Sequence, residues 1–209
     1  MKAIVLAAGK GERMGFPLPK SLLKVGDESI LERQIRILKG NSLDVVIVVG
    51  YRATMVMQAV RAAYVFNSQY FETGSLYSLH LASQMFPLEK SLVMTYADMF
   101  ISNEVVQCVL DKPDSVAVVK PYDGRGTRLY FEEGVAVRAS VATPPDPRGF
   151  SFGGVAHLSR PTLDRIPTIS KFTELSATFG FIGCQLVLTQ GHAVNVNTPG
   201  DLEYARSLG

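Results

Sequence analysis

The residues best suited to chemistry lie in a glycine-rich turn near the start of the chain. Gly9 and Gly11 flank Lys10, and two further cations, Arg13 and Lys20, follow at short distance. Glycines let successive backbone N–H groups converge, and such a turn after a buried strand is how α/β proteins bind phosphate. Arginine and lysine beside it can stabilise the negative charge that builds up when a phosphate ester reacts. The turn therefore predicts a site for a phosphorylated ligand.

Spacing separates this turn from two common phosphate-binding loops. The dinucleotide-binding pattern G-x-G-x-x-G fails because Met14 stands in the place of the third glycine and Gly15 comes one position late. The P-loop pattern fails because Pro19 precedes Lys20-Ser21 where a glycine is required. Both of these nucleotide-binding classes are excluded on spacing.

The turn resembles the signature of the nucleotidylyltransferase family, whose members activate sugar phosphates and alcohol phosphates with a nucleoside triphosphate. The family pattern L-A-A-G-x-G-x-R-[ML] is complete from Leu6 to Met14, and the P-K that follows it is present at Pro19-Lys20. The resemblance implies catalytic roles for Arg13, on the pyrophosphate leaving group, and for Lys20, on the α-phosphate or the acceptor phosphate. It also implies that one continuous loop binds the nucleotide: Leu6, Ala7, Ala8, Gly9, Lys10, Gly11, Glu12 and Arg13.

The same resemblance implies a catalytic Mg²⁺ site built from two residues that are distant in the sequence. Asp98 follows the apolar strand that ends at Tyr96 and matches the metal-binding aspartate of the family. Asn197 stands in the position of the second ligand, where many relatives carry an aspartate. Mg²⁺ is usually held by one or two protein oxygens together with phosphates and water, so this pair would suffice. The competing interpretation makes Asn197 the cap of the last helix; Asp201 is interpreted as support for that helix's dipole.

The stretch from Phe66 to Ala82 resembles the branch of the family that handles small alcohol or amino-alcohol phosphates, such as the phosphocholine cytidylyltransferases. This likeness implies that Gly74 and Ser75 line the base pocket, and it makes CTP the favoured nucleotide, with GTP and UTP as alternatives. We expect acceptor contacts from Lys120, at the end of a strand, and from Gly153, where the family has a glycine that lets substrate approach the sheet.

The acceptor stays open among sugar, polyol and amino-alcohol phosphates. The chain has no tryptophan and no evident aromatic cage, which weakens the case for phosphocholine itself. An acceptor phosphate is already an anion, so attack on the α-phosphorus needs no enzymic base, and the three histidines are interpreted as structural. Two other functions remain: a molybdopterin nucleotide transferase of the same fold, and a non-catalytic regulatory protein that binds a nucleotide.

Composition bounds the class of protein. A chain of 209 residues with 47% hydrophobic residues can bury a sizeable core, and a net charge of +2 is too small to indicate nucleic-acid binding. No apolar run approaches the roughly 20 residues of a membrane span, and the first one is too short for a signal peptide. Cys108 and Cys184 lack metal-ligand spacing and are expected to be reduced. We therefore expect a cytoplasmic enzyme without nucleic-acid or membrane partners, with the oligomeric state open, a homodimer included.

The segments that must position these residues alternate between strand and helix patterns, which favours a largely parallel sheet covered on both faces. Strands are predicted at 3–6, 45–49, 64–67, 91–96, 115–120, 150–158 and 192–197, with an extended piece at 21–25. Helices are predicted at 29–39, 54–62, 102–110, 160–166 and 199–207, and Ser75 is predicted to cap another that ends at Phe86. A hairpin is expected over 123–141 and a mostly helical segment over 171–190.

The family resemblance turns this pattern into a definite fold. It implies a three-layer α/β/α domain with a Rossmann-like, mainly parallel sheet of the nucleotide-diphospho-sugar transferase type. We expect one domain over residues 1–209. Its nucleotide-binding part would span about 1–115, its acceptor-binding part about 116–190, and its metal motif and closing helix 191–209.

Overall fold

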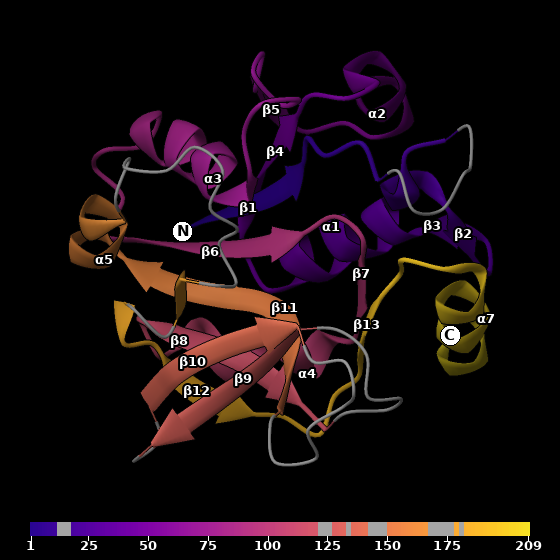
Figure 1. Ribbon diagram of the computed structural model, residues 1–209. Helices are drawn as coiled ribbons and strands as arrows, with labels where there is room; N and C mark the ends of the chain where they lie inside the picture. The colour runs from indigo at the N-terminus through magenta and orange to yellow at the C-terminus, as the bar shows by residue number, and fades with distance from the viewer. Residues whose placement is uncertain (12–17, 121–126, 133–134, 142–149, 167–177, 180–181) are drawn as a thin grey trace.

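Apolar, β-branched residues form the central strands, and these pair into one nine-stranded sheet (Figure 1). The computed structural model describes the chain except residues 12–17, 121–126, 133–134, 142–149, 167–177 and 180–181. The strand order is β5-β4-β1-β6-β11-β8-β12-β10-β9. The strands are β1 (Lys2–Ala7), β4 (Asp44–Val49), β5 (Ala63–Phe66), β6 (Ser91–Tyr96), β8 (Ser115–Val119), β9 (Thr127–Glu132), β10 (Val135–Val141), β11 (Phe150–Ser159) and β12 (Gln185–Leu188).

The sheet is mostly parallel, as the sequence predicts. Strand β1 pairs in parallel with β4 and with β6, β4 pairs in parallel with β5, and β8 pairs in parallel with β12. Strand β11 lies antiparallel between β6 and β8, and β9 and β10 form the predicted antiparallel hairpin. Because β1, β4 and β6 run in one direction, their carboxyl ends meet at one edge of the sheet, where ligands bind in open α/β folds.

Helices cover both faces of the sheet, which confirms the three-layer fold. Alternate residues of β1 point to opposite faces. Ala3 and Val5 pack under α1 (Ile30–Gly40), α2 (Ala53–Ala59) and α4 (Asn103–Leu110). Ile4 and Leu6 pack under α3 (Ser75–Gln84) and α5 (Arg160–Arg165). Within the described part of the chain, no helix is both long and apolar enough to cross a bilayer.

A small antiparallel sheet joins the end of β6 to the end of the chain. Strand β7 (Met99–Ile101), which the sequence did not predict, pairs with β13 (Ala193–Asn195), and α7 (Pro199–Leu208) follows. Apolar side chains of these three elements pack against β2 (Lys24–Val25), which pairs with β3 (Glu28–Ser29). The pairing brings the segment after β6 close to the segment before α7, although they are far apart in the sequence.

Three predicted elements need correction. The helix expected over 171–190 is wrong at its end, because Gln185–Leu188 forms β12 and pairs with β8; residues 167–177 and 180–181 lie outside the described residues. Ser75 does not cap α3, because Gly74 is the N-cap and Ser75 is the first helical residue. The extended piece at 21–25 begins instead with the short 3₁₀ helix η2 (Lys20–Leu22).

Candidate active site

Three predicted site residues meet at the carboxyl edge of the sheet. The Lys20 ammonium nitrogen donates a hydrogen bond to Oδ1 of Asn197 over 2.6 Å. The same nitrogen lies 3.9 Å from Oδ2 of Asp98. The side chain of Lys20 is 8% exposed and that of Asp98 31%, so the lysine is the buried member of the pair and the carboxylate the more exposed one. One cation therefore contacts both of the predicted metal ligands.

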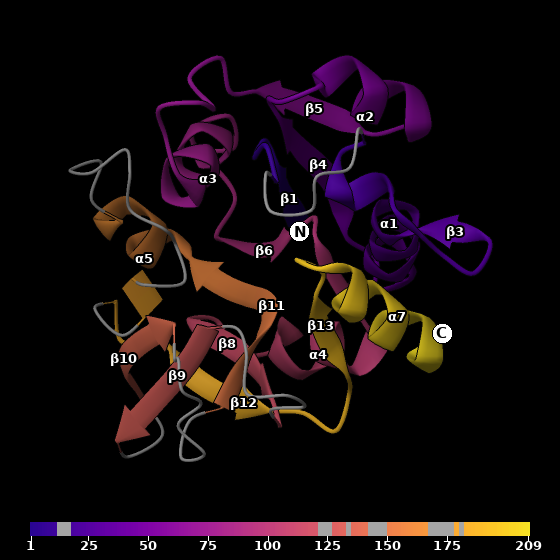
Figure 2. The ribbon, with the colours of Figure 1, turned by 45° about the vertical axis from the view of Figure 1, so that its right-hand side comes forward.

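The β7–β13 sheet is what places Asp98 beside Asn197. Strand β6 ends at Tyr96, and the backbone N–H of Ala97 donates to the carbonyl oxygen of Leu6 in β1 over 3.0 Å. The carbonyl oxygen of Asp98 accepts from the backbone N–H of Val196 over 2.9 Å. These bonds fix the backbone at Ala97 and Asp98, and they fix it at Val196, the residue before Asn197. Figure 2 shows the closing segment, β13 and α7, on the side of the molecule that carries α1 and β3.

Asn197 is not the cap of the last helix, so that competing interpretation is wrong. The N-cap of α7 is Thr198, whose hydroxyl accepts from the backbone N–H of Asp201. The buried Asp201 carboxylate accepts in return from the backbone N–H groups of Asn197, over 3.0 Å, and Thr198, over 2.7 Å. This capping box satisfies the helix N-terminus and holds the Asn197 backbone, which leaves the Asn197 amide oxygen to Lys20.

The stem of Lys20 packs against the loop that is predicted to bind the nucleotide (the nucleotide loop). Gly11 has a φ of +63°, a conformation that favours glycine. A Cβ at this position would also lie 3.0 Å from two carbons of the Lys20 side chain. Gly11 thus lets the loop fold closely over the lysine. Leu6 and Ala7 end β1 and residues 8 to 11 follow it, whereas Glu12 and Arg13 lie outside the described residues.

Gly50, a residue that the sequence analysis missed, joins the nucleotide loop to its neighbours. It follows β4, and a Cβ there would lie 2.6 Å from Cβ of Tyr70 and 2.9 Å from the carbonyl oxygen of Ala8. The backbone N–H of Tyr51 donates to that same oxygen over 3.0 Å. Three segments therefore meet where a side chain would not fit. A glycine directly after a strand at this edge is the signal that could have identified the position.

The segment between β5 and α3 is held by a buried asparagine. Asn67 is 1% exposed, and its amide nitrogen donates to the hydroxyls of Thr73 and Ser78 over 3.0 and 3.1 Å. Its amide oxygen accepts from the backbone N–H of Gln69 over 3.0 Å. The loop predicted to carry the base pocket is therefore fixed at both its beginning and its end.

Ser75 connects the predicted base pocket to the end of β6, the strand that precedes Asp98. Its hydroxyl shares a hydrogen bond of 3.0 Å with the phenol of Tyr96, at the end of β6. The Tyr96 ring packs edge-on against Phe152 of β11, with ring centroids 5.8 Å apart. Gly74 precedes Ser75 as the N-cap of α3, so backbone N–H groups of the first helical turn lie beside this pair. Tyr96 thus stands between the nucleotide side and Asp98.

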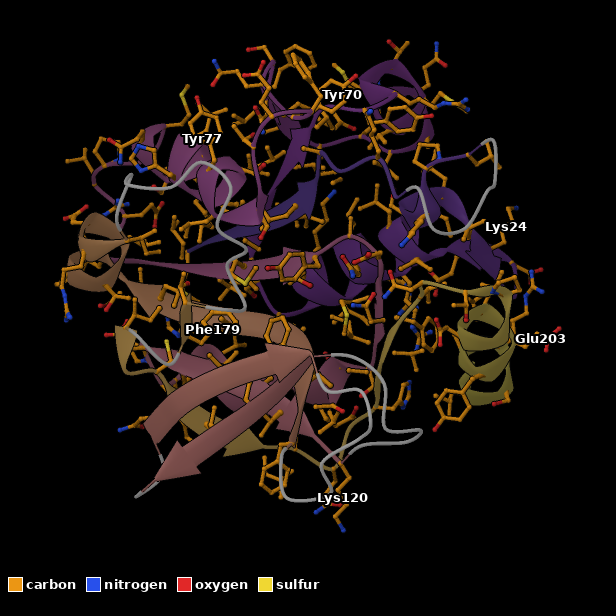
Figure 3. All side chains as sticks on the ribbon, viewed as in Figure 1. Lys24, Tyr70, Tyr77, Lys120, Phe179 and Glu203 are labelled. Carbon is orange, nitrogen blue, oxygen red and sulfur yellow. The ribbon has the colours of Figure 1, made fainter. Side chains whose placement is uncertain are left out.

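The two predicted acceptor residues do not join this cluster. Lys120 follows β8 as expected, but it lines a separate cavity of about 180 Å³ together with residues 189–194 and Tyr204. Figure 3 shows its side chain on the opposite side of the view from Tyr70 and Tyr77. Gly153 lies in an irregularity of the β11–β8 pairing, where a Cβ would be 2.9 Å from the carbonyl oxygen of Ala117. Close strand packing is therefore sufficient reason for a glycine at this position.

The donor atoms of the cluster suit a hard divalent cation. A carboxylate of Asp98 and the amide oxygen of Asn197 both face one point, which Lys20 contacts, and oxygen is the ligand atom that Mg²⁺ prefers. Among the described residues, no group of three or more His, Cys, Asp and Glu side chains competes as a metal site. The pair fits a magnesium ion that takes its remaining ligands from phosphates and water.

Two histidines and the two cysteines lie outside the Lys20 cluster. Buried His157 contacts the carbonyl oxygen of Val109 over 2.9 Å and the hydroxyl of Ser91 over 2.8 Å. His192 stacks on Phe100, and burial lowers its pKa. Cys108 and Cys184 are free thiols, and burial raises the pKa of Cys184 to about 12, which makes it unreactive. None of these four side chains belongs to the Lys20 cluster as the described residues show it.

Comparison with known proteins agrees with this geometry. Residues 3–152 match the family described as MobA-like NTP transferase domain. The chain belongs to this family. The matched region contains the nucleotide loop, Lys20 and Asp98, and it stops before Asn197.

Curated relatives of this family member include a cytidylyltransferase and a protein described as bifunctional. It is 36% identical over 91 residues to the choline-phosphate cytidylyltransferase of Streptococcus pneumoniae, a match that covers 40% of each chain. It is 35% identical over 124 residues to the bifunctional protein GlmU of Cereibacter sphaeroides, covering 56% of this chain and 27% of that one. The matches thus span less than half the length of these relatives.

Solved structures share the fold. The inositol-1-phosphate CTP transferase of T. maritima superposes with a TM-score of 0.76 at 17% identity, covering 99% of this chain and 94% of that one. At this identity the likeness speaks for the fold alone. It includes the α/β arrangement as a whole, from β1 to α7.

Proposed function

We propose that this protein is a Mg²⁺-dependent nucleotidylyltransferase that transfers an NMP group from a nucleoside triphosphate to a phosphorylated small molecule and releases pyrophosphate. CTP is the favoured donor, and a sugar, polyol or amino-alcohol phosphate is the acceptor. Membership of the MobA-like NTP transferase family supports the reaction class. The cytidylyltransferase among the relatives supports the choice of CTP.

The contact of Lys20 with both Asn197 and Asp98 is the observation that carries this proposal. A buried ammonium 2.6 Å from one oxygen ligand and 3.9 Å from another marks a place where positive charge is stabilised. The nucleotide loop folds directly over this lysine, through Gly11. A triphosphate bound along the loop would therefore meet the cluster. A metal ion bound there would offset the charge of the phosphate oxygens as they approach each other.

The chemistry needs positioning and charge more than proton transfer. An acceptor phosphate oxygen attacks the α-phosphorus, a new P–O bond forms, and the bond to the β-phosphate oxygen breaks with pyrophosphate as the leaving group. Lys20 would stabilise the charge on the oxygens around the α-phosphorus, and Arg13 the leaving group. No proton has to be removed from the acceptor, which agrees with the structural explanations for His157 and His192.

We assign the contacts with the base and those with the acceptor to opposite sides of the Lys20 cluster. Gly74 and Ser75 would contact the base, since Ser75 bonds Tyr96 and the loop before it is fixed by Asn67. The acceptor would enter on the side of β11 and β8. Lys120 and Gly153 remain predicted acceptor contacts, although Lys120 lines another cavity and Gly153 has a packing role.

A pyrophosphate-release assay tests the proposal directly. Each of CTP, GTP, UTP and ATP is paired with sugar, polyol and amino-alcohol phosphates in the presence of Mg²⁺. We expect turnover with CTP and one acceptor class, and Asp98→Asn should reduce it at least about 100-fold, because the loss of a catalytic electrostatic group has this magnitude. Asp44→Asn is the matched control, because Asp44 is an exposed carboxylate paired with Lys2.

The rival functions have distinct outcomes in the same assay. Turnover with molybdopterin and with none of the simple phosphate esters would assign the chain to molybdopterin nucleotide transfer. Measurable nucleotide binding without turnover for any pair would overturn the enzyme and leave a nucleotide-binding regulatory protein. Equal activity of Asp98→Asn and the unaltered protein would show that Asp98 is not the metal ligand.

A further inference from the structure

A buried glutamine on α1 holds the turn that carries Asp98. Gln34 is fully buried although its neighbours on the inner face of the helix are apolar, among them Leu31, Ile35 and Leu38. Its amide nitrogen donates to the carbonyl oxygen of Tyr96 over 2.8 Å and to that of Met99 over 2.5 Å. One NH₂ group therefore joins the two residues on either side of Ala97 and Asp98.

These two bonds restrain the turn between β6 and β7 from the side of α1. Between the end of β6 and the start of β7, the backbone is held by the N–H of Ala97 on Leu6 and by the carbonyl of Asp98 on Val196. Neither bond satisfies the carbonyls of Tyr96 or Met99 on the α1 side. Gln34 supplies a donor to each, so the glutamine fixes both ends of the turn relative to the helix beneath it.

The amide oxygen of Gln34 makes the burial of this side chain unfavourable. The Oε1 atom of Gln34 is buried and, among the described residues, has no hydrogen-bond partner. A buried polar atom without a partner is unfavourable, and an aliphatic side chain at this position would avoid the loss. The assignment of nitrogen and oxygen is fixed by chemistry, because an oxygen facing two carbonyls could accept nothing from them. The two hydrogen bonds that the nitrogen donates therefore explain why an amide stands at this position.

We propose that Gln34 is a positioning residue for Asp98: it sets the turn so that the carboxylate meets the oxygen of Asn197 at the metal site. This inference rests on the proposed function, which makes Asp98 a metal ligand. Hydrogen bonds that orient a ligand from behind commonly change metal affinity by about 10- to 100-fold when they are lost. In the described part of the chain, the hydrogen bonds of Gln34 go to the carbonyl oxygens of Tyr96 and Met99, so its effect would pass through the backbone of residues 96–99.

The test compares two variants of adjacent residues on α1. Gln34→Met keeps the length and volume of the side chain and removes both donors. Ile35→Val is the control, because Ile35 is 8% exposed in the same core and its apolar side chain cannot donate a hydrogen bond to the turn. Binding of Mn²⁺ is measured by electron paramagnetic resonance, with a non-hydrolysable CTP analogue present. Gln34→Met should weaken binding about tenfold, and Ile35→Val should change it less than twofold.

A second measurement separates positioning from general loosening of the fold. The Mg²⁺ concentration that gives half-maximal pyrophosphate release should rise in Gln34→Met by about the same factor as the Mn²⁺ dissociation constant. If Gln34→Met does not fold, Gln34→Asn replaces it, since this amide is one methylene too short to reach both carbonyls. Equal Mn²⁺ affinity in the Gln34 variant and the unaltered protein would overturn the inference, as would an equal loss in Ile35→Val.

Asp98→Asn distinguishes this inference from the function on which it rests. Loss of Mn²⁺ binding in Asp98→Asn, with unchanged binding in Gln34→Met, would leave the proposed function standing and remove the role of Gln34. Unchanged binding in Asp98→Asn would overturn the metal site, and the role of Gln34 with it. Loss in both variants supports both assignments.

Discussion

The ammonium nitrogen of Lys20 lies 2.6 Å from Oδ1 of Asn197 and 3.9 Å from Oδ2 of Asp98, so the lysine contacts both predicted metal ligands. A magnesium ion bound to the same two oxygens would face this ammonium at close range, and two cations repel strongly in a poorly solvated site. The negative charge of an incoming triphosphate would offset this repulsion between the metal ion and the ammonium group. The geometry therefore predicts that metal and nucleotide bind together more tightly than either binds alone.

Lys20→Met tests this coupling. The methionine preserves the stem that packs over Gly11 and removes the charge. We expect pyrophosphate release to fall about 100- to 1,000-fold, because a cation facing the reacting phosphate is lost. In the absence of nucleotide, Mn²⁺ binding should become tighter, because no ammonium opposes it. Weaker Mn²⁺ binding without nucleotide would mean that Lys20 supports the metal site rather than competing with it.

Asn197, the proposed second metal ligand, is uncharged, and we expect this to limit the affinity for Mg²⁺. Asn197→Asp adds a negative charge where the amide oxygen now contacts Lys20, and its backbone bond to Asp201 is unaffected. The Mg²⁺ concentration for half-maximal activity should fall several-fold, since a carboxylate attracts a dication more than an amide does. Asn197→Ala should raise it. A titration of activity against Mg²⁺ for the two variants checks both directions, and an unchanged Mg²⁺ requirement in both variants would exclude position 197 as a ligand.

Gly50 should be the least replaceable glycine around the nucleotide loop. In Gly50→Ala the methyl group would clash with Tyr70 at 2.6 Å and with the carbonyl of Ala8 at 2.9 Å. We expect a loss of about 1–3 kcal/mol in unfolding free energy, together with weaker CTP binding, because overpacking shifts the backbone. Gly40→Ala is the control, since nothing lies within 4 Å of its Cβ position. Urea unfolding and a nucleotide titration measure the two effects, and equal stability of both variants would contradict the clash.

The bond between Ser75 and Tyr96 should serve nucleotide binding. Tyr96→Phe removes the phenolic hydroxyl, which lies 3.0 Å from the Ser75 hydroxyl, and keeps the ring that packs on Phe152. The KM for CTP should rise, while kcat at saturating nucleotide changes little. Ser75→Ala should have a similar effect, and the double variant should lose little more than either single one, because the two residues act as a pair. Additive losses would show that they act independently.

The sequence located the local parts of the site and missed those that depend on tertiary contacts. The nucleotide loop and Lys20 lie within one short segment, and their spacing alone excluded two other loop types. Joining Asp98 to Asn197 required the family resemblance, because the β7–β13 pairing that unites them has no local signal. The role of Gln34 could not be identified from the sequence. Helical periodicity places this residue on the buried face of an amphipathic helix, but it does not predict which two carbonyl groups the side chain contacts.

The same limit explains the errors in the fold. Gln185–Leu188 became a strand because β8 offers it a parallel partner, and an apolar segment of four residues carries no clear period of its own. Lys120 was correctly placed after a strand, yet the sequence could not tell that it would line the cavity beside Tyr204. Strand ends identify an edge of the sheet, and the direction of each side chain is decided by twist and neighbouring loops.

The hydrogen bonds of Asp114 lead to a prediction about stability that does not depend on the candidate active site. Its carboxylate accepts from the backbone N–H and the hydroxyl of Ser159, over 2.9 and 2.7 Å, at the start of α5. Burial raises the pKa of Asp114, but the hydrogen bonds from Ser159 and Thr162 outweigh it, so the pKa lies below its usual value. A carboxyl group with a lowered pKa stabilises the folded state above its unfolded pKa of about 3.9, and this stability is lost as the pH falls through the folded pKa.

Asp114→Asn isolates this contribution. Asparagine tolerates the left-handed backbone at this position, where φ is 60°, and it places an N–H donor opposite the donors of Ser159. At pH 7 the variant should lose about 1–2 kcal/mol of unfolding free energy, the scale of a hydrogen bond to a charged group. Below about pH 4 the difference should shrink, because the unaltered carboxyl group becomes protonated and loses its advantage. Urea unfolding between pH 3 and pH 7 measures the trend, with Asp111→Asn, an exposed carboxylate, as the control. A difference that grew toward acid pH would mean that the pKa of Asp114 is raised, and not lowered, in the folded protein.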